Sequence, residues 1–276
     1  MTTFTTADGT EIYFNDWNPA GASGPAIVLI HGWPLDADMW SAQALALAAA
    51  GHRVVAYDRR GFGRSSQPWS GYDYDTMSDD LAGLIDHLGL SEVVLVGFSM
   101  GGGEVARYLG RHGGAKVRKA VLISAVTPFL LKTDTNPTGV DQSVFDGMVA
   151  GLTADRAHFF ADFFPAFYGN TMLHKRVSSE VLTWTQQMAM LASLRATIEC
   201  AKAFAATDFR PDMAAFTMPT LIIHGTADTT VPIDSSGRVA ARMIAGSKLI
   251  EYDEAHALTT TAADRVNSDL LAFIAA

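Results

Sequence analysis

The stretch VVLVGFSMGGG, residues 93–103, decides the fold. A short apolar run, Val93–Val96, leads into a glycine-rich turn that carries Ser99 in the pattern Gly-x-Ser-x-Gly, and a segment of helical composition, Gly101–Gly110, follows. The pattern has meaning only between a strand and a helix. Since both are indicated here, we predict a sharp strand-to-helix turn with Ser99 at its apex.

There is a physical reason why this turn has glycine at positions 97 and 101. A sharp turn strains the backbone at Ser99, and side chains two residues before and after it would collide with the neighbouring chain. The turn also places the Ser99 hydroxyl at a helix N-terminus, where the dipole favours the negative charge of acyl transfer. We predict that Ser99 is a nucleophile. The plainer alternative is a glycine-rich turn with a capping serine.

Short apolar runs alternate with helical segments on both sides of this turn. The expected strands, after an opening hairpin that includes Thr10–Asn15, are Ala26–Ile30, Arg53–Tyr57, Ala120–Ser124, Pro219–His224 and Lys248–Tyr252. The expected helices are Met39–Ala50, Thr76–Leu88 and Leu258–Ile274. This alternation predicts an α/β fold, with a mostly parallel sheet between layers of helices. Such sheets carry their sites at the carboxyl ends of strands.

The alternation stops between residues 128 and 216. That segment has helical character, shows no convincing buried strand and holds ten of the fifteen phenylalanines. We therefore predict a core of residues 1–127 and 217–276, with an inserted helical cap of residues 128–216.

A serine nucleophile needs a base, usually a histidine held in one tautomer by a carboxylate. Asp228 and His256 each follow an expected strand, and they occur in the chain order serine, acid, histidine that this architecture uses. We predict His256 as the base and Asp228 as the group that orients it. His31 and His224 lie at the same edge, but each precedes a glycine turn and is expected to stabilise a loop.

An oxyanion needs two aligned N–H donors. The backbone N–H groups of Met100 and Trp33 are predicted to supply them, although the Trp33 loop could also be a simple turn with its ring in the core. By position, the expected walls of a narrow apolar pocket are Trp33, Met100, Leu130, Phe163, Phe167 and Val231. Any single aromatic among them could instead pack between cap helices. No basic residue is obviously aimed at this pocket, which favours an uncharged ester or amide.

The composition of the chain limits the kinds of partner that it could bind. The 276 residues are 49% hydrophobic and 18% charged, with a formal net charge of -9, which permits a large core and argues against nucleic acid and anionic membranes. The single cysteine, Cys200, allows no internal disulfide, and the apolar runs fall short of the roughly 18–20 residues of a membrane helix. The N-terminus lacks a signal-peptide pattern, so we expect a soluble cytoplasmic protein. The acidic residues near His256 lack metal-ligand spacing, and no cofactor or metal is expected.

Together these motifs resemble a known family. The set resembles the motifs of the α/β-hydrolase fold. It consists of His31–Pro34 (HGWP), Asp58–Gly61 (DRRG), the Ser99 turn, and the pair Asp228 and His256. More narrowly, they resemble bacterial arylesterases and cofactor-free (non-haem) haloperoxidases, or perhydrolases. The likeness extends into the cap, through residues 125–128, 165–169 and 207–209, and covers nearly the whole chain.

The resemblance implies an eight-stranded sheet with one antiparallel strand, a helical cap and hydrolysis of small esters through an acyl-enzyme. It also implies perhydrolysis, in which hydrogen peroxide replaces water and the released peracid oxidises halide without haem or metal. Members usually carry Gly-Asp-x-Asp at the acid and Pro-His-Gly at the base. This chain has Gly225-Thr226-Ala227-Asp228 and Ala255-His256-Ala257 instead, which puts rate and substrate preference in question more than reaction class.

The sequence thus predicts a serine esterase that takes a small ester and uses water or hydrogen peroxide as acyl acceptor. A γ-lactamase, a lactonase or a carbon–carbon bond hydrolase would use the same three residues, and a hydrolase-fold ligand sensor could keep them. Oligomeric state stays open, with a homo-oligomer as one possibility.

Overall fold

The computed structural model describes residues 2–276, and their central feature is one eight-stranded sheet. Its strands follow the order β1-β2-β4-β3-β5-β6-β7-β8. Only β2 runs against the others, so the predicted single antiparallel strand is confirmed. The strands are β1 (Thr3–Thr5), β2 (Glu11–Trp17), β3 (Ile27–Ile30), β4 (Val54–Tyr57), β5 (Val93–Phe98), β6 (Val117–Ile123), β7 (Thr220–Gly225) and β8 (Lys248–Tyr252).

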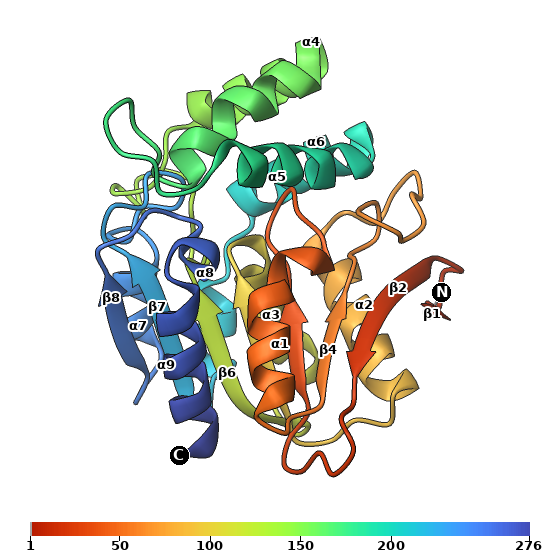
Figure 1. The fold of residues 1–276 in the computed structure, drawn as a ribbon. Helices are drawn as coiled ribbons and strands as arrows, with labels where there is room; N and C mark the ends of the chain where they lie inside the picture. The colour runs from red at the N-terminus through yellow and green to blue at the C-terminus, as the bar shows by residue number, and fades with distance from the viewer. Residues whose placement is uncertain (1) are drawn as a thin grey trace.

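Helices cover both faces of this sheet, as predicted. Figure 1 shows α1 and α9 side by side on one face, with α2 and α3 on the other. The helices and 3₁₀ turns of these layers are η1 (Ala37–Trp40), α1 (Ser41–Ala49), α2 (Tyr74–His87), α3 (Met100–His112), η2 (Arg210–Ala215), α7 (Gly237–Met243), α8 (Leu258–Thr261) and α9 (Ala263–Ala275).

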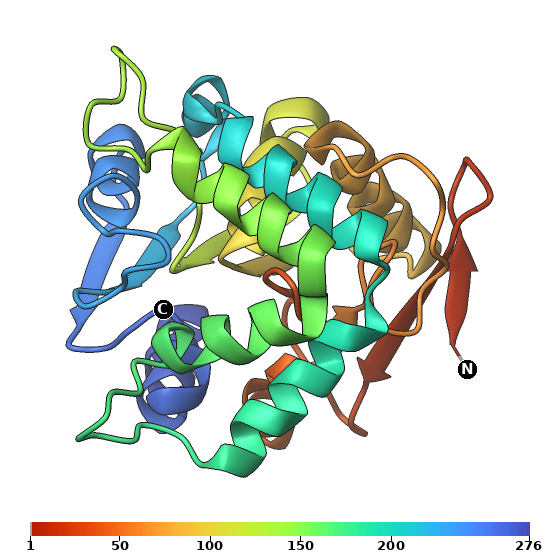
Figure 2. The same cartoon turned by 90° about the horizontal axis from the view of Figure 1, so that it is seen from above.

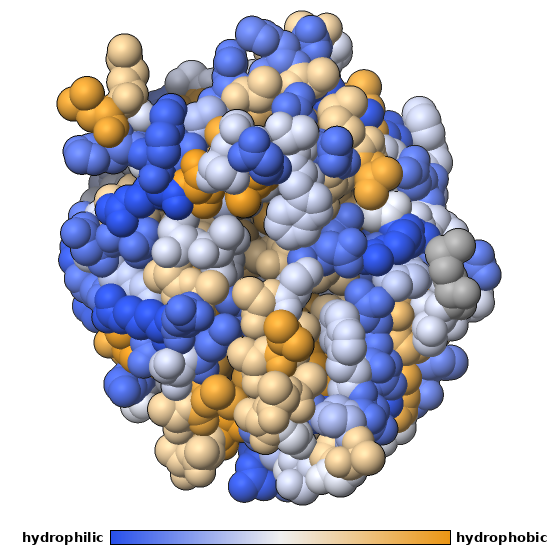
Figure 3. All heavy atoms as spheres, viewed as in Figure 1, coloured by the Kyte–Doolittle hydropathy of each residue, from blue (hydrophilic) through white to orange (hydrophobic). Residues whose placement is uncertain are grey.

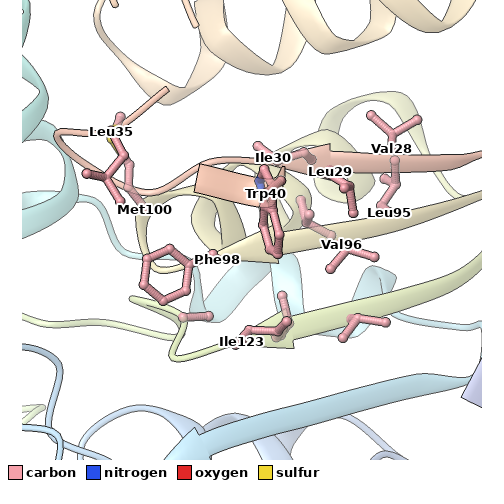
Figure 4. Close-up of a cluster of buried hydrophobic side chains, with 14 of the residues drawn as sticks. Val28, Leu29, Ile30, Leu35, Trp40, Leu95, Val96, Phe98, Met100 and Ile123 are labelled. Atoms are coloured by element: carbon pink, nitrogen blue, oxygen red, sulfur yellow. The ribbon is translucent and has the colours of Figure 1, made fainter. Parts of the chain in front are cut away.

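The central strands are buried along their whole length. Every residue of β3 and β5 is buried, and Figure 4 shows Leu29, Val96 and Ile123, from three neighbouring strands, within one cluster of buried side chains. A parallel strand covered on both faces needs apolar residues at every position rather than at alternate ones. Fully burying one such side chain stabilises the fold by about 1.5–3 kcal/mol. The short continuous apolar runs therefore marked these strands correctly.

The closing helix differs from the prediction of one helix over Leu258–Ile274. Ala262 leaves helical geometry, with φ −128° and ψ 35°, and separates α8 from α9. The composition of the segment is helical throughout, so periodicity alone carried no sign of the break.

Three further helices lie over the carboxyl edge of the sheet (Figures 1 and 2). They are α4 (Gln142–Phe167), α5 (Ser179–Leu191) and α6 (Leu194–Ala206). In the described structure they fall between β6 and β7, and the segment adds no strand to the sheet. This arrangement is the one expected for an inserted cap, while the exact division at residues 127 and 217 stays a prediction.

Helix α4 is broken at Asp155, which sequence reasoning missed. Asp155 has φ −156° and ψ 92°, and its carboxylate accepts a hydrogen bond from the His158 N–H at 3.0 Å, as a residue that caps a new helix does. The halves approach closely, because a Cβ on Gly151 would lie 2.7 Å from the Phe159 ring. Figure 2 shows them running in different directions.

Candidate active site

Ser99 stands at the turn between β5 and α3, in the strained backbone conformation that the sequence predicts. Its φ is 52° and its ψ −117°, a left-handed region that non-glycine residues rarely adopt. A Cβ on Gly97 would lie 2.4 Å from the carbonyl oxygen of Gly101, so glycine is required there. The conformation of the turn therefore depends on glycine at position 97, because a side chain there would collide with the backbone.

Ser99, His256 and Asp228 come together at the carboxyl ends of three strands. The Ser99 Oγ lies 2.9 Å from the His256 Nε2, and the His256 Nδ1 lies 2.6 Å from the Asp228 Oδ2. All three side chains are buried. With the imidazole proton on Nδ1 and donated to Asp228, Nε2 is free to accept the Ser99 hydroxyl proton.

Asp228 is held by its own loop. Its Oδ1 accepts hydrogen bonds from the backbone N–H groups of Thr230, at 2.9 Å, and Val231, at 2.8 Å. Burial alone would raise the pKa of the Asp228 carboxyl, but the neighbouring rings of His256 and His224 outweigh it and hold that pKa well below its usual range. Asp228 is therefore a carboxylate at any pH at which the protein would work.

The loops that carry the acid and the base are bonded to each other. The Ala227 N–H donates to the Glu254 carbonyl at 3.1 Å, and the Thr226 N–H donates to the Tyr252 carbonyl at 2.7 Å. A Cβ on Gly225 would lie 2.2 Å from the same Glu254 oxygen. Glycine at the end of β7 thus lets the two loops approach.

The base loop does not require a glycine directly after its histidine. Ala257 has φ −84°, which any residue adopts, and its N–H donates to the Phe167 carbonyl at 3.1 Å. The Ser124 hydroxyl donates to the His256 carbonyl at 3.2 Å. A backbone bond to α4 and a side-chain bond from Ser124, directly after β6, therefore hold His256 in place.

The loop after β3 lies beside Ser99. A Cβ on Gly32 would sit 3.0 Å from the Ser99 Cβ, and the next residue, Trp33, donates its indole N–H to the Thr197 carbonyl at 2.9 Å. Met100 opens α3, where the first N–H groups have no intrahelical acceptor. Within residues 2–276, the backbone N–H groups of Trp33 and Met100 donate to no protein group. Both are therefore available to an oxyanion.

A buried ion pair joins this loop to the helix behind Ser99. Arg59 donates from Nε to the Glu104 carboxylate of α3 at 2.7 Å and from Nη2 to the His31 carbonyl at 2.9 Å. Burial, followed by the Arg59 charge, holds the pKa of His31 well below its usual range. The Nε2 of neutral His31 accepts a hydrogen bond from the backbone N–H of Arg59, and its Nδ1 donates to the Gly32 carbonyl. His31 therefore stabilises the loop, as predicted.

A cavity of about 520 Å³ opens onto Ser99 and His256. Four predicted wall residues line it: Trp33, Leu130, Phe163 and Val231. The walls that sequence reasoning did not name are Val126, Gly139, Val140, Val144, Phe145, Met148, Phe159, Asp162, Ala166, Phe204, Thr229, Thr230 and Pro232. Helical spacing between residues 144 and 166 was the signal that could have identified the α4 members of this set.

Two predicted wall residues, Phe167 and Met100, lie outside the cavity. The Phe167 ring packs behind His256, with 5.0 Å between ring centroids, and Met100 is fully buried beside β5. Each step of four residues turns a helix by about 40° beyond a full turn. Phe163 faces the cavity, and the next step carries Phe167 away from it, so the expectation for Phe167 is wrong.

The cavity walls are nearly free of charge. Among the described residues that line it, Asp162 and His256 are the only acidic or basic ones, and the Asp162 carboxylate is largely exposed at 73%. It lies 3.3 Å from His158 of the same helix. Sequence reasoning singled out no charged residue here, because an exposed aspartate in a helix is ordinary.

Within residues 2–276, no group of three or more His, Cys, Asp or Glu side chains could hold a metal ion. None of the helices described has the length and apolar character needed to cross a membrane. Figure 3 shows hydrophilic side chains around separate hydrophobic groups on the face that carries α1 and α9.

Comparison with known proteins agrees with this architecture. Residues 25–258 match the alpha/beta hydrolase fold family. The chain is 49% identical to a putative non-heme chloroperoxidase of Synechocystis sp. (96% of this chain, 95% of that protein) and 44% identical to a bifunctional esterase/perhydrolase of Acinetobacter calcoaceticus (98% of each). The crystal structure of a bromoperoxidase from Bacillus anthracis superposes with a TM-score of 0.94 at 41% identity, over all of both chains. The chain therefore belongs to the alpha/beta hydrolase fold family, among relatives that include non-heme haloperoxidases and esterases.

Proposed function

We propose that this protein is a serine esterase that cleaves small uncharged carboxylic esters through an acyl-enzyme on Ser99. The observation that carries the proposal is the hydrogen-bonded series Ser99, His256 and Asp228 at one end of an apolar cavity. A serine near its ordinary pKa is a poor nucleophile, and this series supplies the base that activates it.

Acylation begins when the Ser99 oxygen attacks the ester carbonyl. His256 takes the hydroxyl proton on Nε2, and Asp228 stabilises the resulting imidazolium at Nδ1. The backbone N–H groups of Trp33 and Met100 donate to the oxyanion of the tetrahedral intermediate. When this intermediate collapses, the carbon–oxygen bond to the alcohol breaks, and His256 returns its proton to the departing alcohol.

Deacylation repeats these steps with a second nucleophile. Water gives the carboxylic acid, and hydrogen peroxide gives the peracid, with Ser99 regenerated in both cases. The likeness to an esterase/perhydrolase and to several non-heme haloperoxidases supports peroxide as an alternative acceptor. Halide oxidation would then follow outside the site, by the released peracid.

The cavity supports an uncharged substrate. Its wall residues are mainly aliphatic and aromatic, and they include Thr229 and Thr230, which directly follow Asp228 in the chain. Apolar walls with few polar groups are typical of small-molecule sites. We further propose that residues 128–216 act as a cap over the core of residues 1–127 and 217–276. A buried, unpaired Cys200 suits a reducing cytoplasm.

The decisive experiment measures turnover of 4-nitrophenyl esters of increasing acyl length by the wild type and by Ser99→Ala. Short acyl chains should be preferred, and Ser99→Ala should lower kcat by about 10³-fold or more. Peroxide with bromide should give bromination by the wild type alone.

Three results would contradict the proposal. Near wild-type turnover by Ser99→Ala would remove Ser99 from the chemistry. Activity confined to lactams, lactones or carbon–carbon bonds would replace the ester as substrate. A single acylation without product release would indicate a ligand sensor.

A further inference from the structure

A second histidine, His224, lies against the acid of the site. It occupies the carboxyl end of β7, is fully buried, and has Nε2 3.4 Å from the Asp228 Oδ2. The same Nε2 lies 2.9 Å from the Val231 carbonyl oxygen. Asp228 Oδ2 therefore faces two imidazoles, that of His256 and that of His224.

We propose that His224 is a positioning residue, which holds Asp228 and its loop in the one orientation that serves His256. The inference rests on the proposed function and deepens it. The atoms that surround His224 determine which of its two ring nitrogens carries the proton.

The His224 Nε2 faces three oxygens: the Val231 carbonyl, the Asp228 carboxylate and, at 3.5 Å, the Ser236 hydroxyl. That hydroxyl donates its own proton to the Pro232 carbonyl at 2.7 Å. The opposite nitrogen, Nδ1, is buried and has no hydrogen-bond partner within residues 2–276. A Cβ on Gly237 would lie 2.7 Å from this Nδ1, so the start of α7 closes that side. A proton on Nδ1 would leave a buried donor unpaired and turn the Nε2 lone pair towards the Val231 and Asp228 oxygens, which have no proton to donate. The proton therefore belongs on Nε2.

This N–H acts on Asp228 in two ways. It donates to the Val231 carbonyl, and the N–H of the same Val231 donates to the Asp228 Oδ1 at 2.8 Å. Its positive end also faces Oδ2, the oxygen that accepts the bond from His256. Each carboxylate oxygen thus has its own donors, and a rotation of the carboxylate would lose several contacts at once.

The consequence concerns the base. Asp228 keeps His256 in the tautomer with Nδ1–H only while Oδ2 stays in line with Nδ1. Without His224, the loop from Asp228 to Val231 loses its inner anchor, and Asp228 can turn away from His256. Substrate binding does not involve His224, which is absent from the cavity walls, so kcat should change and KM should not.

The test uses three variants of the whole protein. His224→Leu removes the N–H, His224→Gln keeps an amide donor near the Nε2 position, and His224→Asn moves that donor towards the Nδ1 position. His52→Leu is the matched control, because His52 also has a buried unpaired Nδ1 but precedes β4 at the opposite edge of the sheet.

Two readouts are needed, kcat and KM for 4-nitrophenyl acetate and the far-downfield proton resonance of the Nδ1–H between His256 and Asp228. We expect His224→Leu and His224→Asn to lower kcat by about tenfold or more with unchanged KM, and to shift or broaden the resonance. His224→Gln should restore most of both, and His52→Leu should change neither.

Equal kcat and resonance in wild type and in folded His224→Leu would overturn the proposal. So would equal losses in His224→Gln and His224→Asn, since that result would follow from packing alone. Because these two variants carry the comparison, failure of His224→Leu to fold leaves the test intact. The resonance needs no turnover, so it reports on His224 even if Ser99→Ala disproves the esterase.

Discussion

A Cβ on Gly101 would lie 2.3 Å from the carbonyl oxygen of Ile30. At this point the first turn of α3 rests on the end of β3, directly before the loop that carries Trp33. The close approach brings the turn of the proposed nucleophile, Ser99, and the proposed second N–H donor, Trp33, into one site.

Gly101→Ala should therefore damage fold and site together. The added methyl meets backbone rather than a movable side chain, so we expect a loss of about 1–3 kcal/mol in the free energy of unfolding, with a large fall in kcat. Urea unfolding measures the first and ester turnover the second. Gly147→Ala in α4 is the control, because open space surrounds that glycine and alanine there should add about 0.5–1 kcal/mol. Unchanged unfolding of Gly101→Ala would show that the helix can shift freely.

The positive φ of Ser99 predicts a difference between two inactive variants. Ser99→Ala and Ser99→Gly both lose the hydrogen bond to His256, but only glycine relieves the strain at φ 52°. Ser99→Gly should thus be more stable than Ser99→Ala, by about 1–2 kcal/mol, as a thermal melt would report. Equal melting temperatures would mean that the turn holds little strain.

Asp36 predicts a pH dependence of stability. Burial and the neighbouring Asp58 raise the pKa of its carboxyl from 3.8 to about 7. Between these values the folded state holds a proton that the unfolded state has lost, so stability falls as pH rises through that range. Asp36→Asn, which imitates the protonated form, should flatten the curve and stabilise the protein at pH 8 by at most about 4 kcal/mol. Urea unfolding at several pH values tests this, with exposed Asp264→Asn as the control. Parallel curves for Asp36→Asn and wild type would refute it.

Asp162 predicts discrimination by substrate charge. Its carboxylate is the one acidic group among the described cavity walls, so an anionic ester such as 4-acetoxybenzoate should react poorly beside neutral phenyl acetate. Asp162→Asn should raise the kcat/KM for 4-acetoxybenzoate relative to that for phenyl acetate by about two- to fivefold at low ionic strength. The effect is small because water screens so exposed a charge. Asp86→Asn, an exposed change on α2, should leave the ratio alone. A ratio insensitive to salt and to Asp162→Asn would count against this role.

Sequence patterns predicted the strands and the strand-end residues well, because full burial of a parallel sheet imposes continuous apolar runs. Chain order and strand-end position then brought Ser99, Asp228 and His256 to one edge. Two of the misses have a common cause, since they depend on the direction in which a side chain points within an element. Phe167 follows Phe163 by one helical step yet faces away, and His224 was expected to stabilise its loop but not to face Asp228.

The break at Asp155 was hidden for a different reason. Aspartate signals a helix start only when the preceding residues are not themselves helical, and here helix lies on both sides. Pro165, the residue in α4 that most strongly suggests an interruption, lies within the continuous second half. A local exchange of hydrogen bonds at Asp155, rather than a loss of helix propensity, decides where α4 turns.

The break at Asp155 divides the α4 wall of the cavity into two parts, each of which contacts a different helix of the cap. The first half of α4 packs Phe145 against Phe204 of α6, whereas the second half receives a hydrogen bond from Gln186 of α5 to the Ala157 carbonyl. One half offers Phe145 and Met148 to the cavity, and the other offers Phe159 and Phe163. The second half also holds the proposed base, because Phe167 accepts the Ala257 N–H and packs against the His256 ring. A change of substrate is therefore easier through Phe145 and Met148 than through the half that also holds His256.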